Sequence, residues 1–231
     1  MLADLFKTSL AFSKGDSVVV IGLGRFGCAV AQSLVRLGHE VMGIDRDAQR
    51  VQLWAERLTH TVQADSTDVN TLRQLGVADF PHAIVGIGSD LSASLMTVMA
   101  LTEVQIKDIW LKAVTPEHGQ IAHRIGAHHV VYPEAEMGER IAHLITGRIV
   151  DYIEFGEGFA VATIHAPVPT HNRPLADCGV LKAFGVMVVG VKRAGDNFQH
   201  ALPDTVVLPG DLLIVAGPAG KVEEFAGRAK T

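Results

Sequence analysis

The stretch VVVIGLGRFG, residues 18–27, decides the fold of the N-terminal part of the chain. Four consecutive β-branched residues, Val18–Ile21, predict a strand that is buried on both faces. Gly22, Gly24 and Gly27 follow in the spacing GxGxxG, and apolar residues at helical spacing come next. In such a unit the first glycine permits a tight turn, the second lets the backbone approach a phosphate, and the third lets the helix lie close to the strand. The stretch therefore predicts a loop that holds the phosphates of a nucleotide.

A positively charged residue, Arg25, lies inside this glycine loop. A cation at the N-terminus of a helix is mildly unfavourable, by about 0.3–1 kcal/mol. Arg25 therefore needs either an anionic partner or a solvated position. A guanidinium can donate two hydrogen bonds to a terminal phosphate, and the alternative is an arginine that faces water.

An acidic residue follows the second predicted strand, residues 41–44. This residue, Asp45, stands 21 positions after Gly24. At that distance a carboxylate can accept hydrogen bonds from both ribose hydroxyls, and it would repel a 2′-phosphate. Asp45 therefore favours NAD over NADP, although Arg46 weakens the argument because a neighbouring arginine can accommodate such a phosphate.

The composition narrows the class of protein. Of the 231 residues, 48% are hydrophobic and 19% are charged, and the net charge is −5. The chain can therefore bury a core, and it lacks the basic balance of a nucleic-acid-binding domain. Two cysteines, Cys28 and Cys178, are too few for a disulfide framework. No window reaches the roughly 20 apolar residues of a membrane-spanning helix.

Strands and helices alternate six times along residues 16–136. The predicted strands are 18–21, 41–44, 61–63, 83–87, 109–112 and 130–132. This alternation is typical of a parallel, doubly wound α/β sheet. The helix expected over residues 92–104 is apolar almost all round, which indicates either a large core or an oligomer interface.

The pattern changes after Pro133. Apolar residues at 137, 141, 144, 145 and 149 predict a long crossover helix, residues 137–149. Short strand-like segments predominate beyond it: 150–155, 159–165, 186–192, 205–208 and 212–216, with helices over 175–181 and 219–229. We therefore expect an extension over residues 1–15, a Rossmann-like N-lobe over 16–136, the crossover helix, and a small α+β C-lobe over 150–231.

A catalytic set is not evident in the sequence. The eleven histidines are dispersed, and neither a nucleophile elbow nor a cysteine–histidine cluster occurs. This favours a binding module, while an NAD-dependent dehydrogenase-like oxidoreductase remains the alternative. A redox-sensing DNA repressor would need a helix-turn-helix, for which the residues before the first strand are too few.

Several linked motifs, in order along the chain, resemble one family. They are GLGRFG (22–27), ID (44–45), AD (64–65), IG (87–88), WLKA (110–113), PEAEMG (133–138), GVMVVGVKR (185–193) and GDLLIVAGP (210–218). Together they resemble the regulatory subunits of the bacterial Ktr and Trk potassium uptake systems, of the RCK family (regulators of conductance of potassium). The resemblance implies a nucleotide-binding N-lobe, a crossover helix and a small C-lobe.

The resemblance also implies a function. Such subunits bind ATP, ADP or NAD(H), catalyse no reaction, and change shape with the nucleotide. They form homodimers that assemble into an octameric ring on a membrane-embedded potassium-translocating subunit. The protein would accordingly be cytoplasmic, peripheral at the inner face of the membrane, and would bind no nucleic acid.

The family pattern assigns roles to individual residues. Arg25 would meet the polyphosphate, Asp45 would hold the ribose, and Glu134 resembles an acid implicated in binding a divalent or sodium cation. Some relatives bind a cyclic dinucleotide in the C-lobe through an arginine, but Leu181 takes that position here. The implied nucleotide-binding residues are Gly22, Gly24, Arg25, Phe26, Gly27, Asp45, Arg46, Asp47, Asp65, Ser66, Ile87, Gly88, Ser89, Lys112, Ala113, Val114, His118 and Glu134.

Overall fold

A computed structural model describes residues 15–145, 147–155 and 158–228. These residues form two compact units, of which the first ends at Glu134 and the second begins at Ala135. The expected N-terminal extension, residues 1–15, lies outside the described residues apart from Gly15. No helix within the described ranges is both long and apolar enough to cross a lipid bilayer.

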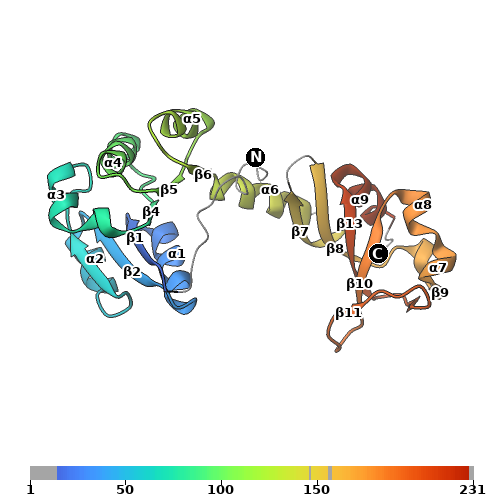
Figure 1. The fold of residues 1–231 in the computed structure, drawn as a ribbon. Helices are drawn as coiled ribbons and strands as arrows, with labels where there is room; N and C mark the ends of the chain where they lie inside the picture. Colours follow the sequence, from blue (N-terminus) through green and yellow to red (C-terminus); the bar gives the residue numbers. More distant parts are fainter. Residues whose placement is uncertain (1–14, 146, 156–157, 229–231) are drawn as a thin grey trace. The chain divides into compact units, whose positions relative to one another are not determined.

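The first unit is built on a six-stranded sheet in which every neighbouring pair is parallel. The strand order is β3-β2-β1-β4-β5-β6, as in doubly wound dinucleotide-binding folds (Figure 1). The expected Rossmann-like lobe is therefore confirmed. The strands are β1 (Ser17–Ile21), β2 (Glu40–Asp45), β3 (His60–Gln63), β4 (His82–Val85), β5 (Asp108–Lys112) and β6 (His129–Val131).

Helices cover both faces of this sheet. Val18 and Val20 of β1 pack with one cluster that includes Ala31 of α1, whereas Val19 and Ile21 pack with the opposite cluster. Both faces of β1 are thus buried, which explains the unbroken run of β-branched residues. The helices are α1 (Arg25–Arg36), α2 (Ala48–Trp54), α3 (Val69–Gln74), α4 (Leu91–Glu103) and α5 (Pro116–Arg124).

Helix α4 is the expected helix that is apolar almost all round. Its buried positions include two hydroxyl side chains, Ser94 and Thr97, as well as Val98. Met96 and Met99, in contrast, are 50% and 57% exposed. The apolar composition therefore extends to a face that this unit leaves open to solvent.

The stripe of apolar residues after Pro133 forms a helix that begins and ends four residues earlier than predicted. Helix α6 covers Pro133–Ile145, and Ile149 is the first residue of strand β7 (Ile149–Phe155). The prediction that Ile149 belongs to the helix is wrong. Gly147 has φ +71°, a conformation that ends a helix, so helical spacing alone carried the expected stripe one turn too far.

The second unit contains a five-stranded sheet in the order β11-β10-β13-β8-β7, antiparallel throughout. Helix α9 (Ala219–Ala226) buries Phe225 and Val222 in the core of this unit. The expected small α+β lobe is therefore confirmed. The remaining strands are β8 (Phe159–His165), β9 (Arg173–Pro174), β10 (Met187–Lys192), β11 (Gln199–His200), β12 (Val206–Val207) and β13 (Leu212–Pro218).

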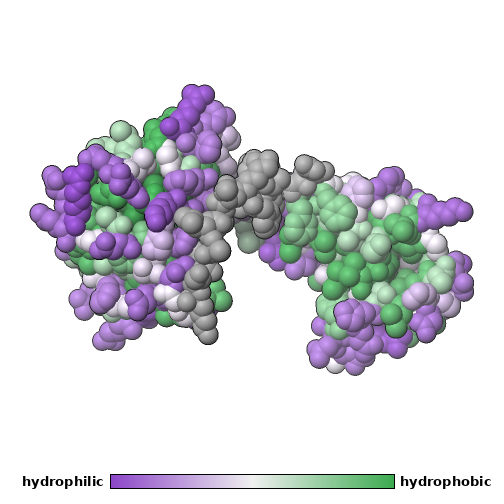
Figure 2. Space-filling view, viewed as in Figure 1, coloured by the Kyte–Doolittle hydropathy of each residue, from purple (hydrophilic) through white to green (hydrophobic). Residues whose placement is uncertain are grey.

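One row of side chains crosses this sheet and remains accessible at both ends. Ile153 pairs with Val161, Val161 with Ala216, and Ala216 with Met187, so these residues share a face. Ile153 and Met187 are 51% and 54% exposed. Figure 2 shows hydrophobic side chains gathered on the visible surface of this unit.

Two details of the second unit differ from the prediction. The single helix expected over residues 175–181 is two short helices, α7 (Leu175–Cys178) and α8 (Val180–Phe184), separated by Gly179 in the left-handed conformation at φ +56°. Strands β9 and β11 were not predicted, because two residues are too few to show a period of two.

Candidate functional site

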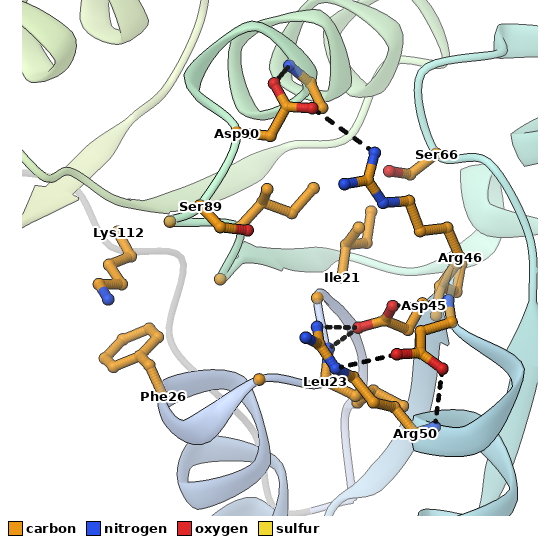
Figure 3. Close-up of a pocket in the computed structure, with 18 of the residues that line it drawn as sticks. Ile21, Leu23, Phe26, Asp45, Arg46, Arg50, Ser66, Ser89, Asp90 and Lys112 are labelled. Atoms are coloured by element: carbon orange, nitrogen blue, oxygen red, sulfur yellow. Dashed lines mark hydrogen bonds and ion pairs between the residues drawn. The ribbon is translucent and has the colours of Figure 1, made fainter.

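A pocket of about 1140 Å³ lies in the first unit at the carboxyl ends of strands β1 to β5 (Figure 3). The loops that follow these strands, together with the start of α1, form its walls. Ligands of open parallel sheets bind at this edge, where the strand order reverses. The volume is ample for a nucleotide, since ligand pockets range over about 300–1000 Å³.

The glycine loop forms the floor of the pocket. Gly22 has φ +93°, and its N–H donates to Ile44 O at 2.8 Å, which ties the loop to β2. Helix α1 begins directly after Gly24, its N-cap, which makes no side-chain capping bond. The first N–H groups of a helix have no acceptor within it and carry the positive end of its dipole. This terminus is therefore suited to bind phosphate.

Asp45 braces the glycine loop from the end of β2. Its side chain is 5% exposed, and one oxygen, Oδ2, accepts the Leu23 N–H at 2.7 Å. The other oxygen, Oδ1, accepts the Asp47 N–H at 2.9 Å, and Arg50 lies 3.4 Å from Oδ2. The carboxylate thus orients the turn between Gly22 and Gly24. A carboxylate accepts about four hydrogen bonds, so acceptor capacity remains for a ribose hydroxyl.

Two arginines lie near Asp45, the residue predicted to hold the ribose. Arg50 pairs with Asp45 and Asp47, and Arg46 lies 3.5 Å from Asp90. In Figure 3 the Arg46 side chain extends from the end of β2 towards Asp90 on the far wall. Asp90 also caps α4 by accepting the Ala93 N–H. The Arg46–Asp90 pair therefore joins two walls of the pocket.

The loop after β3 supplies Asp65 and Ser66. Asp65 accepts hydrogen bonds from the hydroxyl and the N–H of Thr67, and these bonds hold the pKa of Asp65 below its ordinary value. Ser66 is buried and shares a hydrogen bond of 2.8 Å with Thr97 of α4. The Ser66–Thr97 bond therefore ties this loop to α4, and the Asp65 carboxylate stays ionised at neutral pH.

A cation–carboxylate pair lies at the opposite end of the pocket, beside the start of α1. Lys112, at the end of β5, donates to Glu134, and its ammonium lies 5.8 Å from the centre of the Phe26 ring. The bond from Lys112 holds the pKa of Glu134 below the ordinary glutamate value, and the charge of Arg25 acts in the same direction. Arg25 is exposed. The two cations make this end attractive to phosphates.

The structure brings together fifteen of the eighteen predicted residues on the pocket wall. Gly27, Ala113 and His118 do not line it: Gly27 packs against Gly22, while Ala113 and His118 are buried. Ligand contacts remain predictions for all eighteen. The wall also includes residues that were not predicted, namely Ile21, Leu23, Cys28, Ile44, Arg50, Trp54, Ala64, Thr67, Gly86, Asp90, Ser92, Ala93 and Met96.

Two of these unpredicted wall residues, Asp90 and Arg50, could have been predicted from the sequence. Asp90 precedes an apolar helix, which is typical of an N-cap, and the N-cap after β4 lies at the ligand edge. Arg50 follows Asp45 by five residues, in the first turns of the next helix. Cys28 gives no such signal: its thiol donates to Leu23 O at 3.1 Å, and burial raises its pKa to about 11, so it is a poor nucleophile.

A metal ion beside Glu134 would need oxygen ligands in addition to those that the described residues supply there. The described residues contain no group of three or more histidine, cysteine, aspartate or glutamate side chains placed to bind one. Glu134 supplies a single carboxylate, and Lys112 already contacts it. A cation here would therefore share Glu134 with phosphate oxygens.

Comparison with known proteins gives consistent matches along the chain. The TrkA-N domain matches residues 18–133 and the TrkA-C domain matches residues 159–229. The chain is 35% identical to Ktr system potassium uptake protein C of Bacillus subtilis (strain 168), covering 90% of this chain and 95% of that protein. It is 31% identical to Ktr system potassium uptake protein A of Vibrio alginolyticus, covering 88% and 93%.

Solved structures show the same fold. The GsuK RCK domain has a TM-score of 0.64 at 18% identity, over 95% of this chain and 49% of that one. The GsuK channel bound to NAD has a TM-score of 0.62 at 18% identity, over 95% and 41%. This chain thus spans about half of those longer chains or less.

Proposed function

The chain belongs to the family of Ktr potassium uptake proteins, with a TrkA-N domain followed by a TrkA-C domain, and we propose that it is the nucleotide-binding regulatory subunit of a potassium transporter. The resemblance seen in the sequence motifs is thereby confirmed. The observation that carries the proposal is the pocket, in which a glycine loop, a free helix N-terminus and an acid after β2 lie on one edge of the sheet. The ligand is ATP or ADP, or NAD(H).

The residues present fit such a nucleotide. Gly24 has ordinary backbone geometry, and beyond its two chain neighbours no described residue has an atom within 4 Å of where its Cβ would be, so phosphate can approach the backbone. Asp45 offers an acceptor for ribose at one end, and Lys112 and Arg25 offer cations at the other. A structural neighbour, the GsuK channel, is described as bound to NAD, which supports the same ligand class.

The test of this proposal is calorimetric titration of the full chain with ADP, ATP and NAD. We expect at least one to bind at micromolar concentration, because the site offers charge-assisted bonds to a diphosphate. Failure of all three to bind would contradict the proposal. Steady turnover of NADH with candidate substrates would instead support the alternative, a dehydrogenase.

Arg25 is the residue that should distinguish nucleotides by their phosphates. Arg25→Ala is expected to weaken ATP binding by about tenfold, because a charge-assisted hydrogen bond contributes about 1.5–3 kcal/mol. Adenosine binding should change by less than about twofold, since Arg25 lies at the phosphate end. The control is Arg36→Ala, at the other end of α1. Equal losses for ATP and adenosine would assign Arg25 a structural role instead.

Glu134 links the nucleotide to a cation in this proposal. Phosphates that attract the Lys112 ammonium would release Glu134 to share a divalent or sodium ion with them. Glu134→Gln should therefore reduce the effect of Mg²⁺ or Na⁺ on ADP affinity to within about twofold, because the amide keeps the shape and loses the charge. The comparison variant is Glu139→Gln, further along α6. An undiminished cation effect would remove Glu134 from the site.

The remaining parts of the proposal concern assembly. We take the unit that ends at Glu134 as the nucleotide-binding lobe, helix α6 (Pro133–Ile145) as the crossover helix, and the chain from Ile149 onward as the C-lobe. The exposed apolar faces, Met96 and Met99 on α4 and Ile153 and Met187 on the C-terminal sheet, support burial against further copies. The proposed form is a homodimer that assembles into an octameric ring, without catalytic activity, bound from the cytoplasm to a membrane-embedded potassium-translocating subunit.

A further inference from the structure

His118 was expected to contact the nucleotide, but its side chain is buried and only 3% of the residue is exposed. It lies in the first turn of α5, directly behind the loop that follows β5. Val114 of that loop is 49% exposed and lines the pocket. His118 therefore faces the loop from inside the unit, while Val114 faces the ligand side.

Two hydrogen bonds connect His118 to this loop. The Val114 N–H donates to Nδ1 of His118 at 3.3 Å, and the His118 N–H donates to the Thr115 hydroxyl at 3.2 Å. An acceptor nitrogen carries no proton, so the imidazole is neutral with its proton on Nε2. Nε2 is itself buried and has no partner among the described residues. A second proton on the ring would replace the acceptor at Val114 with a donor.

We infer that His118 is a positioning residue for the nucleotide pocket, which holds the loop of Val114 through its unprotonated Nδ1 and releases that loop when the ring is protonated. The inference rests on the proposed nucleotide-binding function. It moves His118 from the predicted set of ligand contacts to a role that acts through the backbone of Val114.

The surroundings of the ring favour its neutral form. Burial lowers the pKa of His118 below the ordinary value of 6.5, and no charged neighbour in the described ranges contributes to that shift. In the folded chain, the His118 ring therefore becomes half protonated only at a pH below that ordinary value. The other titratable groups on α5 and on the elements packed against it are Glu117, His123 and Arg124 on α5, Asp90 and Glu103 at the ends of α4, Asp108 and Lys112 on β5, and His128, His129 and Tyr132 at β6.

Two matched variants of His118 test whether the loop depends on the hydrogen-bond acceptor that Nδ1 provides. His118→Asn keeps an acceptor, Oδ1, at the position of Nδ1 and does not titrate, whereas His118→Leu has the same branched shape without an acceptor. At about pH 8, where histidine is neutral, the Asn variant should bind ADP and NAD like the unmodified chain. The Leu variant should bind them about two- to tenfold more weakly, which is the effect of one lost hydrogen bond.

The pH profile is the readout that a merely structural role would not move. Between about pH 8 and pH 5.5, the unmodified chain should lose more affinity than the Asn variant, in calorimetric titrations of the full chain. ADP has a terminal phosphate that titrates in this range, so its own contribution cancels in the comparison between the two proteins. NAD lacks such a group and serves as the second probe.

The possible results of these titrations distinguish a failure of the inference from a failure of the proposed function. Equal pH profiles of the unmodified chain and the Asn variant would overturn the inference, as would equal affinities of the Asn and Leu variants at the higher pH. If the Leu variant does not fold, the comparison of the two pH profiles still decides. If the unmodified chain binds none of ADP, ATP and NAD at the higher pH, the proposed function fails, and the inference fails with it; if it binds ATP alone, ATP replaces ADP as the probe.

Discussion

Gly27→Ala should destabilise the first unit by about 3 kcal/mol or more. A Cβ at this position would lie 2.0 Å from the carbonyl oxygen of Gly22, which is backbone and has no side chain to move aside. The Gly22 N–H donates to the carbonyl oxygen of Ile44, so β2 holds the glycine turn in place. The methyl group would therefore force α1 away from β1 and withdraw its N-terminus from the proposed phosphate site.

Denaturant unfolding followed by tryptophan fluorescence measures this effect. The two tryptophans of the chain, Trp54 and Trp110, both lie in the first unit, so their emission reports on that unit alone. A midpoint equal to that of the unmodified chain would show that α1 does not approach the loop as closely as the structure has it.

Gly24→Ala is the matched comparison on the same loop. Gly24 has φ −78°, and beyond its two chain neighbours no described residue has an atom within 4 Å of where its Cβ would stand. The variant should be as stable as the unmodified chain, to within about 0.5 kcal/mol. Its nucleotide affinity should nevertheless fall by about tenfold or more, because the methyl group occupies the space that a phosphate would approach. Unchanged affinity would mean that the phosphates lie elsewhere.

The N-terminal sheet was largely predictable from the sequence. Strand β1 is a buried run of β-branched residues, and glycine and N-cap residues separate the strands from the helices, so the alternation of elements and the fold class followed from the pattern. The crossover helix was overextended to Ile149 because helical spacing ignores a glycine such as Gly147 that takes a positive φ. Strand β9 pairs with β12, which lies far along the sequence, and β11 is only two residues long although it pairs with the preceding strand β10, so neither shows a local pattern.

Most of the predicted residues lie on the pocket wall, but the hydrogen bonds that hold the glycine loop were not predictable from the motif. The glycine spacing predicted the loop, but the bond from Leu23 to Asp45 involves a variable position of the motif, where residue type carries no information. For His118, the sequence indicates a residue near the ligand edge without indicating which way the ring points. Burial is a property of the packed fold, so only the structure moves His118 behind the loop.

Asp45→Asn should both destabilise the first unit and abolish nucleotide binding, although the change replaces one oxygen by an NH₂ group. The two carboxylate oxygens accept different backbone N–H groups, Leu23 at 2.7 Å and Asp47 at 2.9 Å. An amide has one acceptor oxygen, so one N–H would face another donor. A buried donor without an acceptor costs about 1–3 kcal/mol. We expect a loss of about 2 kcal/mol in the free energy of unfolding.

Asp47→Asn separates this effect from the loss of a negative charge. It removes the same charge two residues away, where the side chain caps α2 by accepting the N–H groups of Gln49 and Arg50. Asparagine is as good an N-cap as aspartate, so stability should change by less than about 0.5 kcal/mol. Equal unfolding midpoints for the two variants would show that Asp45 does not brace the glycine loop. A stable Asp45→Asn protein that still binds ADP would further show that the ribose has another partner, because the proposed acceptor would then be dispensable.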